Sequence, residues 1–487
     1  MIPKEIREQM QEAISVKNIR KVGRLNTKSA EQWKESRLGI GFEKLDRGVF
    51  KPENAYDKLA KIGVKWVRLQ SGWARTEKTP GVYDFAWLDS IVDNLIARGM
   101  LPWMCLCYGN ALYDDYAAQV FGAVGCPPVY TEEQKEAWRK YVTATAAHFK
   151  GRVRHFEVWN EPDGIWCWKK GVNATEYAGL VLETAAALKA GNEDAYVIGG
   201  SVLTSPITYL QEALAGGMGN VIDALSFHEY TYTEENVTQK VRALRGICGL
   251  NGISPEIIQG ESGSQSRGDG HGALAEGDWT PRAQAKQLLR HLTVDLLNDV
   301  KFTSFFTCVD MIEALNGKVG DLASYLDYGY FGVLGADFDE NGIATGAYTL
   351  KPSYYALQNL SALLGGKITV MDLPVIFHRE EVPHLGKAMT TAAHEAVYGG
   401  FRLNNGSYAL AYWKPENLMT TEWTGCVTLE TTVPGEIHLL DPMDGTVYEI
   451  TNAETTPFGA SMLHFLPIRD YPLFLLFGPV DMTEERD

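Results

Sequence analysis

The chain has 487 residues, and its 45 Lys and Arg against 61 Asp and Glu give a formal net charge of −16. This balance excludes nucleic acid as a partner, because it offers no excess of cations to neutralise phosphates. With 45% hydrophobic and 22% charged residues, the composition is that of a globular protein and excludes disorder or a coiled coil.

The start of the chain and its cysteines bear on location and metal content. Residues 3–10 are charged and helical in pattern, and they lack the apolar core of a secretory signal. No run is long enough to span a bilayer, so we expect a cytoplasmic protein without a membrane partner. The seven cysteines lack the paired spacing of zinc sites, and we expect neither a metal nor a cofactor. The oligomeric state stays open, a homo-oligomer included.

Short apolar runs alternate with amphipathic helical stretches from about residue 38 to 365. Capping signals at Thr131 and at Thr280-Pro281 mark two helix starts, and a last helix is expected over 353–364. The predicted strands are 38–42, 64–69, 101–107, 153–160, 195–200, 222–228, 256–260 and 301–308. Eight strand–helix units predict a (β/α)8 TIM barrel, an α/β fold, rather than a doubly wound sheet with its phosphate-binding glycine turn.

The pattern changes beyond Gly365-Gly366. Short strands separated by turns follow, and Asn404-Asn405-Gly406 predicts a tight hairpin because Asn-Gly pairs tolerate positive φ angles. We therefore expect a barrel over 37–365 and an all-β sandwich over 366–487. Residues 1–36 form an N-terminal extension that packs on the barrel or on the sandwich.

Two glutamates stand where predicted strands end. Glu161 follows the fourth strand and Glu261 the seventh, and barrels of this kind carry their active sites at the C-terminal ends of the strands. The two side chains should therefore face each other across the barrel mouth. Paired carboxylates suit the cleavage of a glycosidic bond, because one can attack the anomeric carbon while the other gives a proton to the leaving oxygen.

The residues around these glutamates resemble the signature of clan A retaining glycoside hydrolases. The resemblance is carried by Asn160-Glu161-Pro162, Glu261 at the end of the seventh strand, Arg68 at the end of the second, and His228 with Tyr230 at the end of the sixth. Within the clan, the sequence looks most similar to the family that contains β-xylosidases and α-iduronidases.

The resemblance implies a role for each of these residues. Glu261 would be the nucleophile, with Arg68 beside it, and Glu161 the acid/base that protonates the leaving group. Asn160 would donate to the sugar 2-hydroxyl group, and the two residues of the sixth strand would orient the nucleophile or contact the sugar. The two carboxyl groups are then expected about 5–5.5 Å apart, with retention of the anomeric configuration.

A wider set of side chains could contact the sugar. Phe306 ends the eighth strand, where clan members commonly carry a tryptophan, and the loop residue Trp279 is the alternative platform. Further candidates are Glu43, Trp73, Trp166, Asp310, Glu313 and, for a uronic acid carboxylate, Arg267. Each also has a structural interpretation: an ion pair or loop anchor for the acids, core packing for the tryptophans and plain surface exposure for the arginine.

The sequence predicts a retaining, exo-acting β-glycosidase that removes terminal sugars from short oligosaccharides or small glycosides. Carbohydrate is then the partner, with a β-xyloside as the first substrate. A metal-dependent sugar isomerase or epimerase is one alternative, because Glu157, His228, Glu261 and Asp310 could gather around a divalent cation; Glu157 is otherwise expected in an ion pair inside the barrel. A carbohydrate-binding protein with a lapsed active site is the other alternative.

Overall fold

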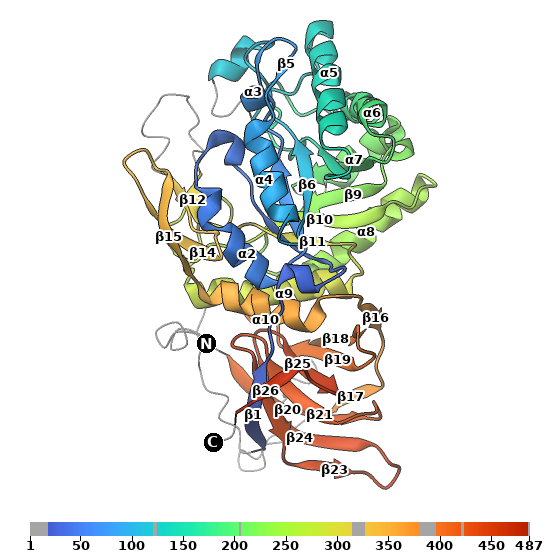
Figure 1. The fold of residues 1–487 in the computed structure, drawn as a ribbon. Helices are drawn as coiled ribbons and strands as arrows, with labels where there is room; N and C mark the ends of the chain where they lie inside the picture. Colours follow the sequence, from blue (N-terminus) through green and yellow to red (C-terminus); the bar gives the residue numbers. More distant parts are fainter. Residues whose placement is uncertain are drawn as a thin grey trace.

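The computed structural model describes residues 18–119, 124–203, 206–313, 327–378, 396–419 and 423–485. The helical pattern predicted over residues 3–10 lies outside these ranges. Figure 1 shows two bodies: a barrel surrounded by helices above and an all-β domain in orange and red below.

Eight parallel strands close the barrel in the order β10-β11-β2-β3-β6-β7-β8-β9. They are β2 (Leu38–Gly41), β3 (Trp66–Gln70), β6 (Leu101–Leu106), β7 (His155–Val158), β8 (Tyr196–Val202), β9 (Ala224–His228), β10 (Glu256–Ser262) and β11 (Thr303–Phe305). The strands read as apolar runs because helices cover the outer face of the sheet while side chains fill the inside. Each strand overlaps one of the eight predicted runs, and the (β/α)8 fold is confirmed.

Helices follow the strands around the barrel. The main ones are α2 (Tyr56–Ile62), α4 (Ala86–Ile96), α5 (Glu132–His148), α6 (Ala174–Gly191), α7 (Ile207–Ala215), α8 (Val237–Leu250), α9 (Pro281–Leu297) and α10 (Pro352–Leu364). The side chain of Thr131 accepts the N–H of Gln134, and that of Thr280 accepts the N–H of Ala283. These caps satisfy N–H groups that a helix start leaves without a partner, as the capping signals predict.

The loops of the barrel contain one short helix and three short strand pairs. They are α3 (Trp73–Thr76), the pair β4 (Glu77–Thr79) and β5 (Val82–Tyr83), the pair β12 (Met311–Ile312) and β13 (Tyr328–Gly329), and the pair β14 (Leu334–Phe338) and β15 (Ala344–Leu350). The last two pairs follow β11, so the final strand–helix unit carries the longest insertion.

The all-β domain consists of two antiparallel sheets, as predicted. The larger has the order β16-β18-β19-β25-β21-β22-β1-β26 and the smaller β17-β20-β24-β23. The bounds are β1 (Ile19–Leu25), β16 (Thr369–Met371), β17 (Val375–His378), β18 (Val397–Arg402), β19 (Tyr408–Trp413), β20 (Thr424–Thr431), β21 (Ile437–Asp441), β22 (Thr446–Ile450), β23 (Ala453–Thr455), β24 (Ser461–Arg469), β25 (Leu473–Phe477) and β26 (Met482–Glu484). Strands β18 and β19 form the hairpin predicted around Gly406, which has a φ of 86°.

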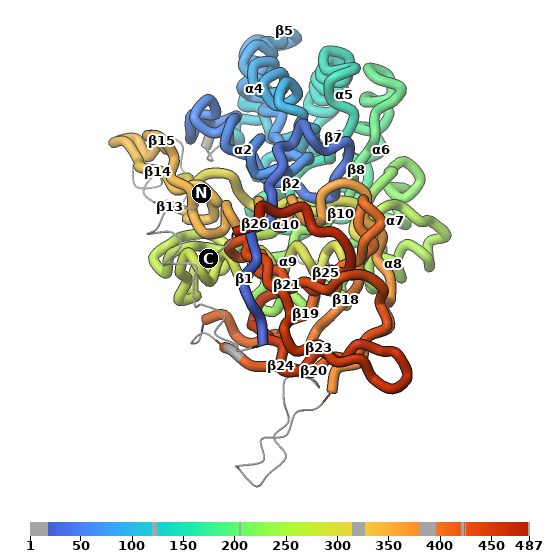
Figure 2. The backbone as a smooth tube through the Cα atoms, turned by 60° about the horizontal axis from the view of Figure 1, so that its bottom comes forward, coloured from blue at the N-terminus to red at the C-terminus, as the bar shows by residue number. Residues whose placement is uncertain are grey.

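The N-terminal strand belongs to the all-β domain. β1 pairs antiparallel with both β22 and β26, and Figure 2 shows it as a blue strand among red ones. The chain then enters the barrel, so the β domain is built from both ends of the sequence.

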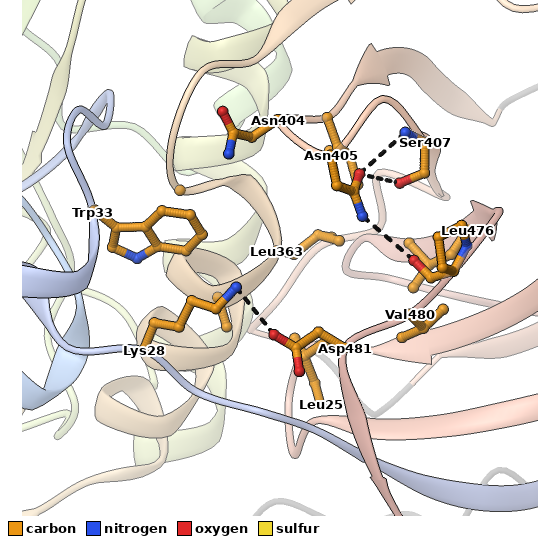
Figure 3. A pocket seen from close by; sticks show the side chains of 14 residues that line it. Leu25, Lys28, Trp33, Leu363, Asn404, Asn405, Ser407, Leu476, Val480 and Asp481 are labelled. Carbon is orange, nitrogen blue, oxygen red and sulfur yellow. Dashed lines mark hydrogen bonds and ion pairs between the residues drawn. The ribbon is translucent and has the colours of Figure 1, made fainter.

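The two bodies meet along α9 and α10 (Figure 1). Lys286 of α9 and Asp470 of the β domain form a buried ion pair of 2.8 Å. A crevice of about 90 Å³ lies at this boundary and is lined by Trp33 and by Leu363 at the end of α10. Lys28 and Asp481 form an ion pair of 3.0 Å in it (Figure 3). Within the described ranges, each helix is too short or too polar to cross a membrane.

Candidate active site

A cavity of about 440 Å³ lies at the C-terminal ends of the barrel strands. All of its lining residues come from the barrel and none from the β domain. Eight of the predicted site residues line it: Glu43, Asn160, Glu161, Trp166, Tyr230, Glu261, Phe306 and Glu313. Both candidate catalytic carboxylates therefore lie in one cavity, as their positions at the ends of barrel strands predict.

The two carboxylates are close neighbours. One oxygen of Glu161 and one of Glu261 lie within 4.8 Å of each other. This is near the separation of about 5–5.5 Å that suits a covalent intermediate and below the roughly 6.5–9.5 Å that leaves room for a water between the groups. Glu161 and Trp159 both have positive φ angles, 44° and 65°, a strained backbone of the kind that clusters at functional sites.

Arg68 connects the nucleophile candidate, Glu261, to other polar residues of the site through hydrogen bonds. Its guanidinium donates to Glu157 at 2.7 Å, to Glu261 at 2.6 Å and to the Asn160 side-chain oxygen at 2.9 Å. Burial alone would raise the pKa of Glu157, but the adjacent Arg68 and His228 bring it far below its usual value. Arg68 is fully buried and does not line the cavity, so it lies beside the nucleophile candidate as predicted and positions the carboxylates, and its assignment as a substrate-binding residue is corrected.

His228 faces the acid/base candidate. Its Nδ1 lies 3.1 Å from Glu161, and its Nε2 lies 3.6 Å from Glu157. Burial lowers the pKa of His228, but the nearby carboxylates of Glu157, Glu161 and Glu261 outweigh burial and raise it to about 10. The side chain is fully buried beneath the cavity. His228 is therefore placed to be an imidazolium that orients Glu161, and not a direct sugar contact.

Two aromatic residues donate to the catalytic pair from the cavity side. The Tyr230 hydroxyl donates to Glu261 at 2.6 Å, and Trp166 Nε1 donates to Glu161 at 2.7 Å. Trp166 folds back on the chain at Gly164, where an added Cβ would come within 2.6 Å of the indole. Each carboxylate thus has one donor from the barrel interior and one from the cavity.

Both predicted tryptophans outside the strand-4 loop lie away from the cavity. Trp73 is 1% exposed, donates to Glu77 at 2.5 Å and stacks with Tyr113 and Tyr141, so it belongs to the core. Trp279 is 3% exposed and donates to the Leu274 carbonyl at 2.7 Å. Both are corrections to the prediction, and Phe306 supplies the aromatic wall in their place.

Asp310 and Arg267 are also engaged elsewhere. Asp310 is buried, pairs with Lys351 at 2.6 Å and accepts the N–H of Gly332, so it anchors a loop. Arg267 forms a two-point ion pair with the neighbouring Asp269 at the surface. Neither lines the cavity, and the prediction that they contact substrate is wrong for this geometry.

Other cavity residues were not among the predicted contacts. Gln70 donates to the Tyr108 hydroxyl at 3.0 Å and accepts from Arg47 at 2.7 Å. Gln70 and Tyr108 directly follow predicted strands, so their positions at strand ends could have identified them as cavity residues. Phe331 lies in the long insertion after β11, where the sequence offers no such signal.

One group among the described residues could hold a metal ion: Glu161, His228 and Glu261. The four-residue set predicted for an isomerase is not assembled, because Asp310 is bound to Lys351 and Glu157 is not a member of the group. The three residues Glu161, His228 and Glu261 are already engaged, since Arg68 donates to Glu261 and His228 bonds Glu161. A cation would have to compete with both contacts.

Fold and site together define a (β/α)8 barrel with two opposed carboxylates in its mouth, an arrangement suited to glycosidic bond cleavage. Residues 57–244 match the family model described as glycosyl hydrolases family 39. A β-xylosidase from Geobacillus stearothermophilus is 28% identical over 161 residues, 31% of this chain and 31% of that protein. The aligned stretch thus spans about a third of the curated relative's length.

Solved structures extend the likeness to the whole fold. A family 39 glycoside hydrolase from Bacteroides cellulosilyticus WH2 has a TM-score of 0.65 at 16% identity, over 93% of this chain and 83% of that one. A monomeric β-xylosidase from Caulobacter crescentus CB15 has a TM-score of 0.56 at 17% identity, over 93% and 97%. The family model and the curated relative confirm the resemblance to the family that contains β-xylosidases. At 16% and 17% identity, the solved structures inform on the fold alone.

Proposed function

We propose that the protein is a retaining, exo-acting glycoside hydrolase. One observation carries the proposal: Glu161 and Glu261 bring carboxylate oxygens within 4.8 Å of each other in the cavity. This spacing favours direct attack on the sugar and a covalent intermediate, because an inverting enzyme needs a water between its carboxyl groups.

The first step would use both carboxylates. Glu261, ionised between Arg68 and Tyr230, attacks the anomeric carbon while Glu161 gives its proton to the glycosidic oxygen. The bond from the anomeric carbon to Glu261 forms as the bond to the leaving oxygen breaks, and the aglycone departs as a neutral alcohol. Asn160, held by Arg68, is positioned to bind the 2-hydroxyl group.

The second step would reverse these roles. Glu161, now a carboxylate, takes a proton from a water molecule, and the water oxygen attacks the anomeric carbon. The ester to Glu261 breaks, the sugar leaves with its configuration retained, and Glu161 again holds a proton. No cofactor enters either step.

We further propose a terminal β-xyloside as the substrate. The support is the name of the curated relative, a β-xylosidase, together with the family model matched by the barrel. The matched segment contains Arg68, Asn160, Glu161 and the strand-6 residues but ends before Glu261. Action in the cytoplasm on short oligosaccharides is part of the proposal, and a homo-oligomer remains compatible with it.

A panel of nitrophenyl glycosides, with the first-formed anomer identified by NMR, tests this function. We expect turnover with retention. Glu261→Gln should abolish turnover of every substrate. Glu161→Gln should spare the first step with glycosides whose leaving group needs no protonation, and it should slow the second step, which loses its base. Inversion would refute the mechanism, and no turnover across the panel would favour the carbohydrate-binding alternative. Loss of activity in EDTA with recovery in Mn²⁺ would favour the isomerase.

A further inference from the structure

Glu43 is a buried carboxyl group in the cavity wall that the two-step mechanism does not use. It follows β2, is 1% exposed and lines the cavity. Its side chain folds back over the chain, so that a Cβ added at residue 41 would lie 2.1 Å from one carboxyl oxygen and 2.6 Å from the other. Gly41 therefore provides the space that this carboxyl group occupies.

The hydrogen bonds of one oxygen favour the neutral acid. Thr307 Oγ1 lies 2.9 Å from the Gly41 carbonyl oxygen and 3.2 Å from Glu43 Oε2. A hydroxyl group has one hydrogen to donate, and a carbonyl oxygen can only accept. The hydrogen of Thr307 is therefore best used on Gly41, and the contact with Glu43 is satisfied when the carboxyl group donates its own proton to Thr307.

The other oxygen lacks a hydrogen bond. Glu43 Oε1 is buried without a hydrogen bond from any described residue. The Arg68 guanidinium lies 3.6 Å away, close enough for an ion pair but not for a hydrogen bond, whereas it reaches Glu157 and Glu261 at 2.7 and 2.6 Å. A buried oxygen without a hydrogen bond is unfavourable, and a ligand hydroxyl group in the cavity would supply the missing one.

The surrounding charges agree with this geometry. Burial raises the pKa of Glu43 to about 7, with Arg68 lowering it and Glu261 raising it. Among the described residues, Tyr230 and Cys308 also interact with this carboxyl group. The ammonium of the adjacent Lys44 is directed to Glu313.

We propose that Glu43 is a specificity residue that, as the neutral acid, accepts a hydrogen bond from one hydroxyl group of the terminal sugar through Oε1. The inference rests on the proposed function and adds a contact by which the glycone is recognised. Ionisation of Glu43 would place a new negative charge beside Glu261 and compete for Arg68. Activity should therefore fall as the pH rises through about 7.

Two substitutions separate recognition from structure. Glu43→Gln keeps the shape, the acceptor and the donor to Thr307 but cannot ionise, so the loss of kcat/KM near pH 7 should disappear. Glu43→Leu removes the acceptor and should lower kcat/KM by about 10- to 100-fold. Glu234→Gln is the matched control, because Glu234 is a buried glutamate outside the cavity whose pKa burial also raises to about 7.

A set of monodeoxy glycosides then identifies the hydroxyl group. One of them should lose about 10- to 100-fold in kcat/KM with wild type and Glu43→Gln, yet little with Glu43→Leu. The inference is overturned if Glu43→Gln keeps the wild-type decline near pH 7, or if Glu43→Leu loses the same factor on every deoxy substrate. These outcomes leave the proposed function standing, whereas absence of wild-type turnover refutes both.

Discussion

Replacing Tyr230 by Phe tests how Glu261 is released from the covalent intermediate. The Tyr230 hydroxyl donates to Glu261 at 2.6 Å, and its ring makes edge contacts with Phe306 and Phe331 at centroid distances of 6.4 and 6.1 Å. Phe keeps these ring contacts. The variant therefore removes one hydrogen bond without opening a cavity in the site.

The size of the effect follows from the charge on Glu261. A hydrogen bond to a charged group contributes about 1.5–3 kcal/mol, and about 1.4 kcal/mol corresponds to a tenfold change in rate. Glu261 regains its charge as the ester breaks in the second step, so we expect that step to slow by about 10- to 100-fold. The first step neutralises Glu261 and should change less.

The assay is a pre-steady-state measurement with a dinitrophenyl β-xyloside. The variant should release about one equivalent of phenol in a burst and then turn over slowly, so that kcat falls while kcat/KM changes by less than about threefold. Thermal unfolding within a few degrees of wild type is the control for folding. Equal falls in kcat and kcat/KM without a burst would refute the reasoning.

Three further predictions concern the buried network. Arg68→Met should lower the free energy of unfolding by about 3–5 kcal/mol, because Glu157 is left buried without its closest counter-charge. In urea unfolding, the double variant Arg68→Met/Glu157→Gln should regain part of this free energy. Equal losses in the single and the double variant would contradict the prediction. His228 has a pKa raised to about 10 from about 6.5 in the unfolded chain, so its stabilisation is complete below pH 6.5 and lost as the pH rises through 10. The stability difference between wild type and His228→Asn should therefore shrink between pH 6.5 and 10, and a constant difference would oppose the assignment. Gly260→Ala should cost about 1–3 kcal/mol, since its Cβ would lie 2.5 Å from Ser226 Oγ and 3.0 Å from His228 Nε2; a thermal midpoint equal to that of wild type would contradict it.

The fold and the catalytic pair could be predicted because both can be read from short stretches of neighbouring residues. The barrel strands are continuous apolar runs, and Glu161 and Glu261 stand where two of them end. The alternation of side chains along a strand also predicts which residues face the barrel interior, because residues an even number apart point to the same side. Glu157 lies four residues before Glu161, and it faces the interior and bonds Arg68, as an even spacing predicts.

The direction of loop side chains could not be predicted in this way. Trp73 lies only three residues beyond Gln70, the last residue of β3, yet the turn into α3 places its ring among core aromatics while Gln70 lines the cavity. Asp310 and Glu313 both follow β11, and only the position of Lys351, far along the chain, determines that Asp310 is taken up in an ion pair. Such outcomes depend on contacts between distant segments.

The close approach of the two carboxylates explains why the site contains buried cations. If both were ionised with oxygens within 4.8 Å of each other, they would repel by at least about 3 kcal/mol at an effective dielectric constant near 20. Arg68 lies on Glu261 and His228 on Glu161, so each carboxylate has its own positive neighbour. Glu157 bonds Arg68 and faces His228 from below and keeps both cations in place.

This set of charges balances in both states of the proposed reaction. In the free enzyme, Arg68 and His228 oppose the carboxylates of Glu157 and Glu261, and the proton on Glu161 makes the sum zero. In the covalent intermediate Glu261 is a neutral ester and Glu161 is the carboxylate, and the sum is again zero. The reaction thus moves one negative charge over less than 5 Å inside a buried network without changing its total. Two cations for three carboxylates are what this exchange requires, and an ionised Glu43 would upset the balance in both states.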